Sequence, residues 1–186
     1  MHVIAYETTR PGDLPNARIR HYIPAHSWTH QFLQLLRVHW AYVQDPAVRA
    51  INGVYFPVSP TQALAEMRMA MPGYAWYYGV QIGLDPTPAR ADDYKLLQNI
   101  NELPYPSGWW SFESKVSPVQ TINGKRRVIV SKTFANWGPK HYVIQEIGLY
   151  ALNFGAIYCI ARDTHLVGIN MPPGTSCTIF YYIDAP

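Results

Sequence analysis

The fold is decided by the stretch TINGKRRVIV, residues 121–130. At its centre Asn123 and Gly124 lie between two β-prone runs. A type I′ turn needs a positive φ at both central residues, and Asn-Gly is the pair that most often meets this need. We therefore predict a β-hairpin at this point and assign Asn123 and Gly124 a structural role.

Further β-prone runs surround this hairpin. They occupy residues 128–134, 142–152, 156–161 and 175–183, with glycine or proline clusters between them, and an alternating run at 74–84 precedes them. Strands joined by short turns predict a mainly β protein, an antiparallel β-sandwich or jelly roll. Alternation places one set of side chains in its core: Val128, Val130, Phe134, Ile147, Leu149, Ile160, Ile179 and Tyr181.

The first 74 residues carry different signals. Residues 1–27 contain three prolines and no regular period, which predicts an extended arm. Apolar residues recur at helical spacing from 28 to 43, and a capping serine followed by proline opens a second segment at 60–69, so two short helices should follow the arm. We divide the chain into an N-terminal arm with helices, 1–74, and a β-sandwich domain, 75–186.

The arm mixes arginines with apolar side chains and is too broken to fold alone. Such a segment gains order by docking on a neighbour or by adding a strand to a foreign sheet edge. The candidate subunit-interface residues in the arm are Val3, Ile4, Tyr6, Ile19 and Tyr22. Removal of the arm is expected to leave the thermal unfolding of the β-domain nearly unchanged.

Composition limits the possible partners. The chain has 186 residues, 48% of them hydrophobic, a net charge of +3 and only 15% charged residues. Phosphate neutralisation needs more basic surface than this, so no specific nucleic-acid binding is expected. The single basic run, Lys125-Arg126-Arg127, is interpreted as a solvated hairpin edge. No apolar stretch is long enough to predict membrane insertion, and no signal peptide is apparent.

The two cysteines give a further indication of compartment. Cys159 and Cys177 both fall in predicted strands, where a free thiol behaves as a small buried hydrophobe. We expect synthesis in the cytoplasm, where a disulfide between them is disfavoured.

Catalytic and metal-binding patterns are missing from the sequence. His26 and His30 stand four apart but in no HExxH motif, and the chain has no CxxC pair, GxSxG elbow or glycine-rich phosphate loop. Asp92 and Asp93 are adjacent, so their carboxylates diverge, and capping of a turn is the favoured role. We expect no enzymatic activity, no catalytic residue, no metal and no cofactor.

Paired tryptophans begin one predicted strand. Because neighbouring strand residues point to opposite faces, either Trp109 or Trp110 must lie away from the main core. An exposed aromatic can stack on a sugar ring or anchor a neighbouring subunit. Packing beneath the N-terminal helices is the remaining alternative. Both residues are therefore candidate interface residues.

One acid stands alone in the run 142–152. Alternation puts Glu146 on the side of Ile144 and Gly148, and a covered carboxylate needs a partner. Arg162 on the following strand is within reach across a hairpin. A cross-strand Glu146–Arg162 pair is therefore predicted, with a structural role for both residues.

A series of short motifs runs through residues 75–183. In order they are GVQIG at 79–83, DYKL at 93–96, VSKTFAN at 130–136, EIGLY at 146–150, IARD at 160–163, PGT at 173–175 and FYYI at 180–183. Their order and spacing resemble a family of β-sandwich virion proteins of tailed bacteriophages. The resemblance implies a structural component of the particle with no enzymatic activity.

We therefore expect a non-enzymatic structural subunit of a tailed-phage virion, in the tail, neck or head, that assembles with copies of itself and with other virion proteins. Its N-terminal arm and sheet edges would carry the contacts. The alternative is a β-sandwich module of a phage fibre or baseplate that binds a host glycan through Trp109, Trp110 or nearby tyrosines.

Overall fold

The computed structural model describes residues 2–9, 19–25, 28–41, 44–59, 68–70, 77–100, 108–122, 124–153 and 155–185. The elements are β1 (His2–Thr9), β2 (Ile19–Ala25), α1 (His30–Ala41), β3 (Asp45–Arg49), β4 (Tyr55–Val58), β5 (Gly79–Gly83), β6 (Trp109–Val116), β7 (Gln120–Ile122), β8 (Lys125–Asn136), β9 (Tyr142–Asn153), β10 (Ala156–Met171) and β11 (Thr175–Ala185).

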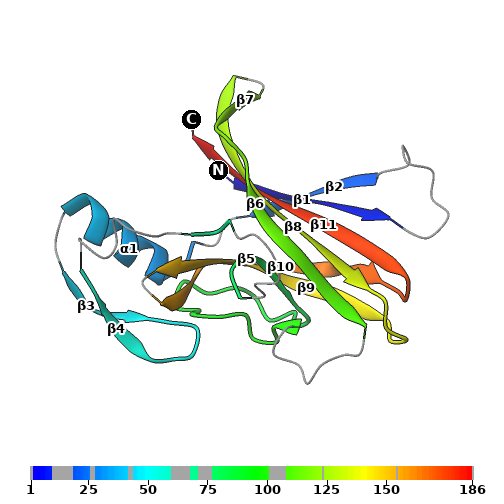
Figure 1. Ribbon diagram of the computed structural model, residues 1–186, viewed down its shortest axis with the longest axis horizontal. Helices are drawn as coiled ribbons and strands as arrows, with labels where there is room; N and C mark the ends of the chain where they lie inside the picture. The colour runs from blue at the N-terminus through cyan, green and yellow to red at the C-terminus, as the bar shows by residue number, and fades with distance from the viewer. Residues whose placement is uncertain are drawn as a thin grey trace.

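The strands form antiparallel sheets, so the mainly β prediction is confirmed (Figure 1). The large sheet has the order β2-β1-β11-β8-β6, with β7 also paired to β8, and the small sheet has the order β10-β9-β5. A separate two-stranded sheet joins β3 to β4. The arrangement is consistent with a β-sandwich, whereas the strand order does not establish a jelly roll.

The predicted Asn-Gly hairpin is present. Strand β7 pairs with β8, and Ile122 lies opposite Lys125, which leaves a two-residue connection. Gly124 has a φ of 75°, as the turn type requires, and a Cβ at this position would meet nothing within 4 Å. Asn123 itself lies outside the described residues.

The later strands also lie where the sequence predicts them. Strand β10 is longer than expected, because it continues past Ala161 to Met171 and ends only before Pro172. Register shifts against β9 occur between Cys159 and Ala161 and between Thr164 and Ile169. These irregularities bend the strand without ending it. Arg162 and Asp163 therefore lie within β10, beyond the end of the strand predicted at 156–161.

The extended-arm prediction is wrong for the part of it that the structure describes. Strand β1 pairs with β11 of the same chain over eight register positions, from His2↔Ile183 to Thr9↔Ser176. Strand β2 pairs in turn with β1 and forms one edge of the large sheet. Pro24 had argued against a strand, because a proline lacks an N–H donor. It is tolerated here because β2 is an edge strand. The segment completes its own sheet.

Only one of the two predicted helices falls on described residues. Helix α1 spans His30–Ala41, inside the predicted range 28–43, and packs on β10 and β3. The range 60–67 lies outside the described residues, and Arg68 just beyond it forms an isolated β-bridge with Leu152, so the predicted helix does not extend to Met69. The boundary proposed near residue 74 is also outside them.

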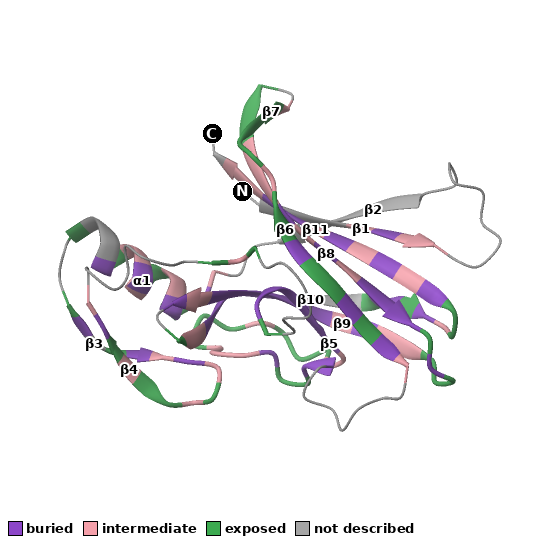
Figure 2. Cartoon of the chain, viewed as in Figure 1, coloured by how far each residue is buried: buried purple, intermediate pink, exposed green. Residues whose placement is uncertain are grey.

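The core lies between the two sheets and continues beneath α1 (Figure 2). Seven of the eight predicted core residues are buried: Val130, Phe134, Ile147, Leu149, Ile160, Ile179 and Tyr181; Val128 is partly exposed. Leu35 and Val38 of α1 belong to the same core. Strand β5 is buried on both faces, so its predicted alternation does not apply.

Candidate functional site

In the described part of the chain, a buried charged cluster joins Arg162 to two carboxylates. Arg162 Nε donates to Glu146 Oε2 at 3.0 Å, and Arg162 Nη1 donates to Asp93 Oδ2 at 2.7 Å. The side chains of Arg162 and Glu146 are completely buried. We call Arg162, Glu146 and Asp93 the buried ion network. The predicted cross-strand Glu146–Arg162 pair is present, whereas no sequence pattern indicated Asp93 as a third member.

Glu146 also anchors the backbone of the loop at 84–100. Its Oε1 accepts the N–H of Gln98 at 2.7 Å and that of Asp85 at 3.4 Å, and its Oε2 accepts the N–H of Leu97 at 3.0 Å. Buried carboxylates are tolerated when their lone pairs are used in this way. The network therefore holds the loop against the small sheet.

Arg162 binds the other side of that loop. It donates to the carbonyl oxygens of Thr87 at 2.9 Å and Pro88 at 3.4 Å. Burial disfavours its charge, but the hydrogen bonds that it donates to Asp93 and Glu146 outweigh this effect and raise the pKa of Arg162. The guanidinium thus acts as a permanently charged clamp between β10 and the loop.

Glycines at the facing positions make room for these side chains. Gly83 of β5 pairs with Glu146 of β9, and a Cβ on Gly83 would lie 2.3 Å from Glu146 Oε1. A Cβ on Gly148, opposite Arg162, would lie 2.9 Å from Leu96 Cδ2. Several motifs that the sequence analysis singled out, GVQIG, DYKL, EIGLY and IARD, therefore meet at this one place.

Asp163 has a separate role on the opposite side of β10. Tyr181 Oη donates to Asp163 Oδ2 at 2.7 Å. Burial and the nearby carboxylate raise the pKa of Tyr181 well above its usual value. This contact links the small sheet to β11 of the large one. It is a structural bond between the two sheets.

The paired tryptophans of β6 point to opposite faces, as predicted. Trp109 is buried and makes an edge contact with Tyr142 at a centroid distance of 5.5 Å. Trp110 is 40% exposed, Phe112 is 44% exposed and Trp137 is 59% exposed. Trp137 lies 5.6 Å from the Trp110 ring and 6.2 Å from Phe112. We call Trp110, Phe112 and Trp137 the aromatic cluster.

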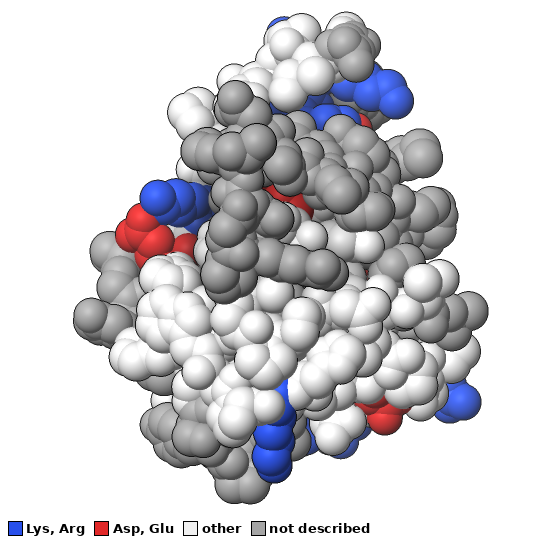
Figure 3. All heavy atoms as spheres, turned by 90° about the vertical axis from the view of Figure 1, so that its right-hand side faces the viewer, with Lys and Arg blue, Asp and Glu red and all other residues white. Residues whose placement is uncertain are grey.

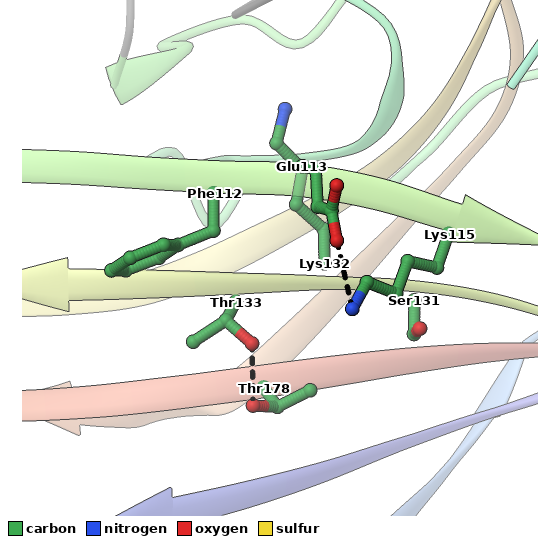
Figure 4. A pocket seen from close by; sticks show the side chains of 7 residues that line it. All are labelled: Phe112, Glu113, Lys115, Ser131, Lys132, Thr133 and Thr178. Atoms are coloured by element: carbon green, nitrogen blue, oxygen red, sulfur yellow. Dashed lines mark hydrogen bonds and ion pairs between the residues drawn. The ribbon is translucent and has the colours of Figure 1, made fainter. Parts of the chain in front are cut away.

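An open groove of about 440 Å³ adjoins the aromatic cluster. Figure 4 shows the residues that line this outer groove: Phe112, Glu113 and Lys115 of β6, Ser131, Lys132 and Thr133 of β8, and Thr178 of β11. Thr133 and Thr178 share a hydrogen bond of 2.8 Å, and Lys115 pairs with Glu113 at 2.8 Å. The groove therefore presents hydroxyls, both charges and one aromatic ring.

Lys132 differs from the other groove residues, because its side chain passes behind β6 and away from the groove (Figure 4). The residue is 1% exposed, and Nζ donates to the carbonyl of Tyr78 at 3.4 Å. Burial lowers the pKa of Lys132 from 10.5 to about 8. The charged form of the Lys132 amine therefore lowers the stability of the folded protein.

Replacement of Lys132 by Met should reveal that cost as a pH dependence. The folded state releases the Lys132 proton near pH 8, whereas the unfolded chain keeps it to about 10.5. Wild-type stability should therefore rise relative to Lys132→Met by about 2–3 kcal/mol between these values. Urea denaturation at several pH values measures the difference, and Lys140→Met removes an exposed lysine as a control. A difference in unfolding free energy between wild type and Lys132→Met that does not change with pH would refute the lowered pKa of Lys132.

Charged side chains outside the buried ion network are dispersed over the described surface. Among the described residues on the face shown in Figure 3, blue and red side chains are scattered between white, uncharged ones. Of the predicted basic run, Arg127 is paired with Asp184 at 2.5 and 2.8 Å and stacks over Tyr182, and this pairing lowers the pKa of Asp184. Lys125 and Arg126 are exposed. Arg127 of this run thus forms a cross-strand contact, and the other two residues are the solvated part of it.

Both cysteines are free and buried, as predicted. Burial raises the pKa of Cys177 to about 12 and that of Cys159 further. Within the described residues, no group of His, Cys, Asp or Glu is arranged to hold a metal ion. None of the helices described is long and apolar enough to cross a membrane.

The predicted interface residues of the arm lie in the large sheet. Val3 and Ile4 are in β1, opposite Tyr182 and Tyr181, and Ile19 and Tyr22 are in β2. Tyr6 is half-buried against the core, and this burial raises its pKa. The side chains of Val3, Ile4, Ile19 and Tyr22 lie outside the described part of the chain.

Comparison with known proteins adds no relative. No family model, no curated protein and no solved structure matches the chain. The resemblance to phage virion proteins therefore stays a prediction.

Proposed function

We propose that this protein is a non-enzymatic β-sandwich subunit of a tailed-phage virion that assembles with copies of itself and with other virion proteins. The aromatic cluster is the observation that carries the proposal. The Trp137 ring contacts both Trp110 and Phe112, and each of the three side chains is 40% or more exposed. Contiguous exposed aromatics are typical of interaction sites, where Trp anchors contribute most of the binding energy.

Its position also suits an interface. The aromatic cluster belongs to β6, which forms one edge of the large sheet, and to the turn after β8. Trp109, on the other face of β6, packs against Phe134 and Tyr142, so the strand is held by the core. A rigid strand presents its exposed side chains to a partner with little entropy lost on binding.

The buried ion network supports the same proposal in a different way. It ties the loop at 84–100 to both β9 and β10 through charged hydrogen bonds. A particle subunit has to keep one shape while it is loaded by its neighbours, and such a clamp resists deformation. Four of the seven motifs that carry the resemblance, GVQIG, DYKL, EIGLY and IARD, contribute to this clamp.

Replacement of Trp110 by Ser should weaken assembly. Loss of a central aromatic anchor costs about 2 kcal/mol or more at an interface, or roughly thirtyfold in affinity. Light scattering of the purified protein over a concentration series, and quantitation of the subunit in purified particles, measure the effect. Val167→Ser removes a more exposed apolar side chain outside the cluster as a control. Equal incorporation of the Trp110→Ser and wild-type subunits would refute the proposal.

A second candidate function is binding of a host glycan. The outer groove favours it, because the Phe112 ring lies beside the hydroxyls of Thr133 and Thr178 and the Glu113–Lys115 pair. An apolar sugar face stacks on a ring while its hydroxyls bond to such polar groups. A glycan that binds here should change the fluorescence of Trp110 and Trp137, whereas pure assembly predicts a change with protein concentration alone.

A further inference from the structure

A second pocket lies at the other end of the molecule, between α1, the β3–β4 hairpin and the loop at 84–100. Its volume is about 420 Å³, within the range of roughly 300–1,000 Å³ usual for small-molecule sites. The side chains that bear on its chemistry are His30, Gln31, Arg49, Tyr55 and Asp92. We call it the polar pocket. It shares no residue with the outer groove or the aromatic cluster.

Arg49 is the cation of the polar pocket. Its guanidinium carbon lies 3.6 Å from the centre of the Tyr94 ring and 5.7 Å from that of Tyr55. Tyr55 is also its cross-strand neighbour in the β3–β4 pair. The two rings fix the guanidinium in place, yet no described carboxylate forms an ion pair with it, and its buried Nε has no hydrogen-bond partner in the described chain. A half-buried, pre-positioned and unpaired Arg favours an anionic ligand.

Gln31 supplies the second unsatisfied group. The residue is 4% exposed, lines the polar pocket, and its Oε1 has no hydrogen-bond partner among the described residues. A buried polar atom without a partner is rare and calls for an occupant. Gln31 Oε1 accepts and Arg49 Nε donates, so an occupant that satisfies both needs donors as well as acceptors.

Asp92 further restricts the kind of ligand that the polar pocket can bind. It is an exposed carboxylate on the rim of the same pocket, where it can accept hydrogen bonds from hydroxyls and repels a multiply charged anion. Tyr55 is 59% exposed, so much of its surface is available to an apolar ligand face. These features together fit a ligand with one carboxylate, several hydroxyls and an apolar ring face.

The buried ion network holds this rim in place. Asp93, next to Asp92, is bonded to Arg162 and accepts the N–H of Arg90 at 2.7 Å. The N–H of His30, the first residue of α1, donates to the carbonyl of Ala91 at 2.6 Å. The walls of the polar pocket are therefore fixed before any ligand arrives, which lowers the entropic cost of binding.

We propose that the polar pocket binds an acidic sugar residue, with its carboxylate on Arg49, its hydroxyls on Asp92 and Gln31, and its ring against Tyr55. Phosphate or a nucleotide fits less well, because a dianion would approach Asp92. The inference does not depend on virion assembly, since it uses no residue of the aromatic cluster.

NMR titration of the intact protein with three probes tests the assignment. Glucuronate should bind at least tenfold more tightly than glucose, which lacks the carboxylate, and at least tenfold more tightly than acetate, which lacks the ring. Arg49→Gln should abolish the preference for glucuronate over glucose. Asp92→Asn changes an exposed side chain, leaves folding intact, and should weaken both sugars about three- to tenfold.

Trp110→Ala serves as the matched control and should leave glucuronate binding unchanged. The proposal is overturned if glucuronate binds no better than glucose, if acetate binds as tightly as glucuronate, or if Arg49→Gln keeps the preference. Absence of any shift at the resonances of Gln31 and Tyr55 would show that the pocket holds water only. Loss of binding in Trp110→Ala would move the sugar site to the outer groove.

Discussion

Replacement of Arg162 by Met should lower the free energy of unfolding by about 3–5 kcal/mol. The substitution leaves the fully buried Glu146 and the neighbouring Asp93 without their cation. It also removes the bonds from the guanidinium to the carbonyls of Thr87 and Pro88. Removal of one partner from a buried ion pair costs far more than the pair contributes, because an uncompensated charge stays in a medium of low dielectric constant.

Two comparisons make this prediction specific. Lys115→Met breaks the exposed Glu113–Lys115 pair and should cost less than about 1 kcal/mol. Arg162→Lys keeps the charge but cannot reach Glu146, Asp93 and the loop together, so its cost should be intermediate. Urea denaturation measures all three variants, and hydrogen exchange at the amides of Leu97 and Gln98 should accelerate in Arg162→Met. A loss in Arg162→Met no larger than in Lys115→Met would show that the network contributes little.

Part of this network was visible in the sequence for a local reason. Glu146 is the only acid in a long alternating run, so burial of its face required a cation, and the next strand offers Arg162 across a hairpin. The register places Glu146 opposite Thr164 and Arg162 opposite Gly148, a diagonal pair that long side chains can span. The Asn-Gly hairpin was predictable for the same kind of reason, since its turn chemistry involves adjacent residues.

The third member of the network was not predictable, because it comes from a loop far away in sequence. Asp93 was expected to cap a turn, and it does accept the N–H of Arg90. Its bond to Arg162 depends on how the loop folds over the small sheet, which no periodicity reports. The same holds for the polar pocket, because Arg49 of β3 and Asp92 of the loop come to line one pocket only when these distant segments pack together with α1.

The partner of the N-terminal segment was the largest error of the prediction from sequence. Apolar residues and prolines in the first 27 positions predicted a segment that needs an external partner, and the segment does have a partner, β11 of its own chain. Sequence patterns identify a strand that requires a neighbour but do not identify the neighbour. Bringing β1 beside β11, which is far away in sequence, costs chain entropy. This cost is offset only once the whole sheet has formed.

Deletion of residues 1–26 should therefore prevent stable folding. The truncation removes β1 and β2, strips β11 of eight paired residues, and uncovers the core beside Tyr6. Domains of this size are stable by about 5–15 kcal/mol, and loss of an entire central strand is of that order. The newly open edge of β11 also invites aggregation. Circular dichroism and thermal unfolding of the truncated chain, compared with Tyr6→Ala at about 1–3 kcal/mol, measure the effect.

A peptide of residues 1–26 provides the complementary test. If β1 belongs beside β11, the peptide added in excess should bind the truncated chain and restore its unfolding transition, because the lost pairing is then recovered in two pieces. A truncated chain that unfolds at the wild-type temperature without the peptide would contradict the pairing of β1 with β11. The N-terminal segment would then be free to contact a neighbouring subunit, as the sequence alone predicted.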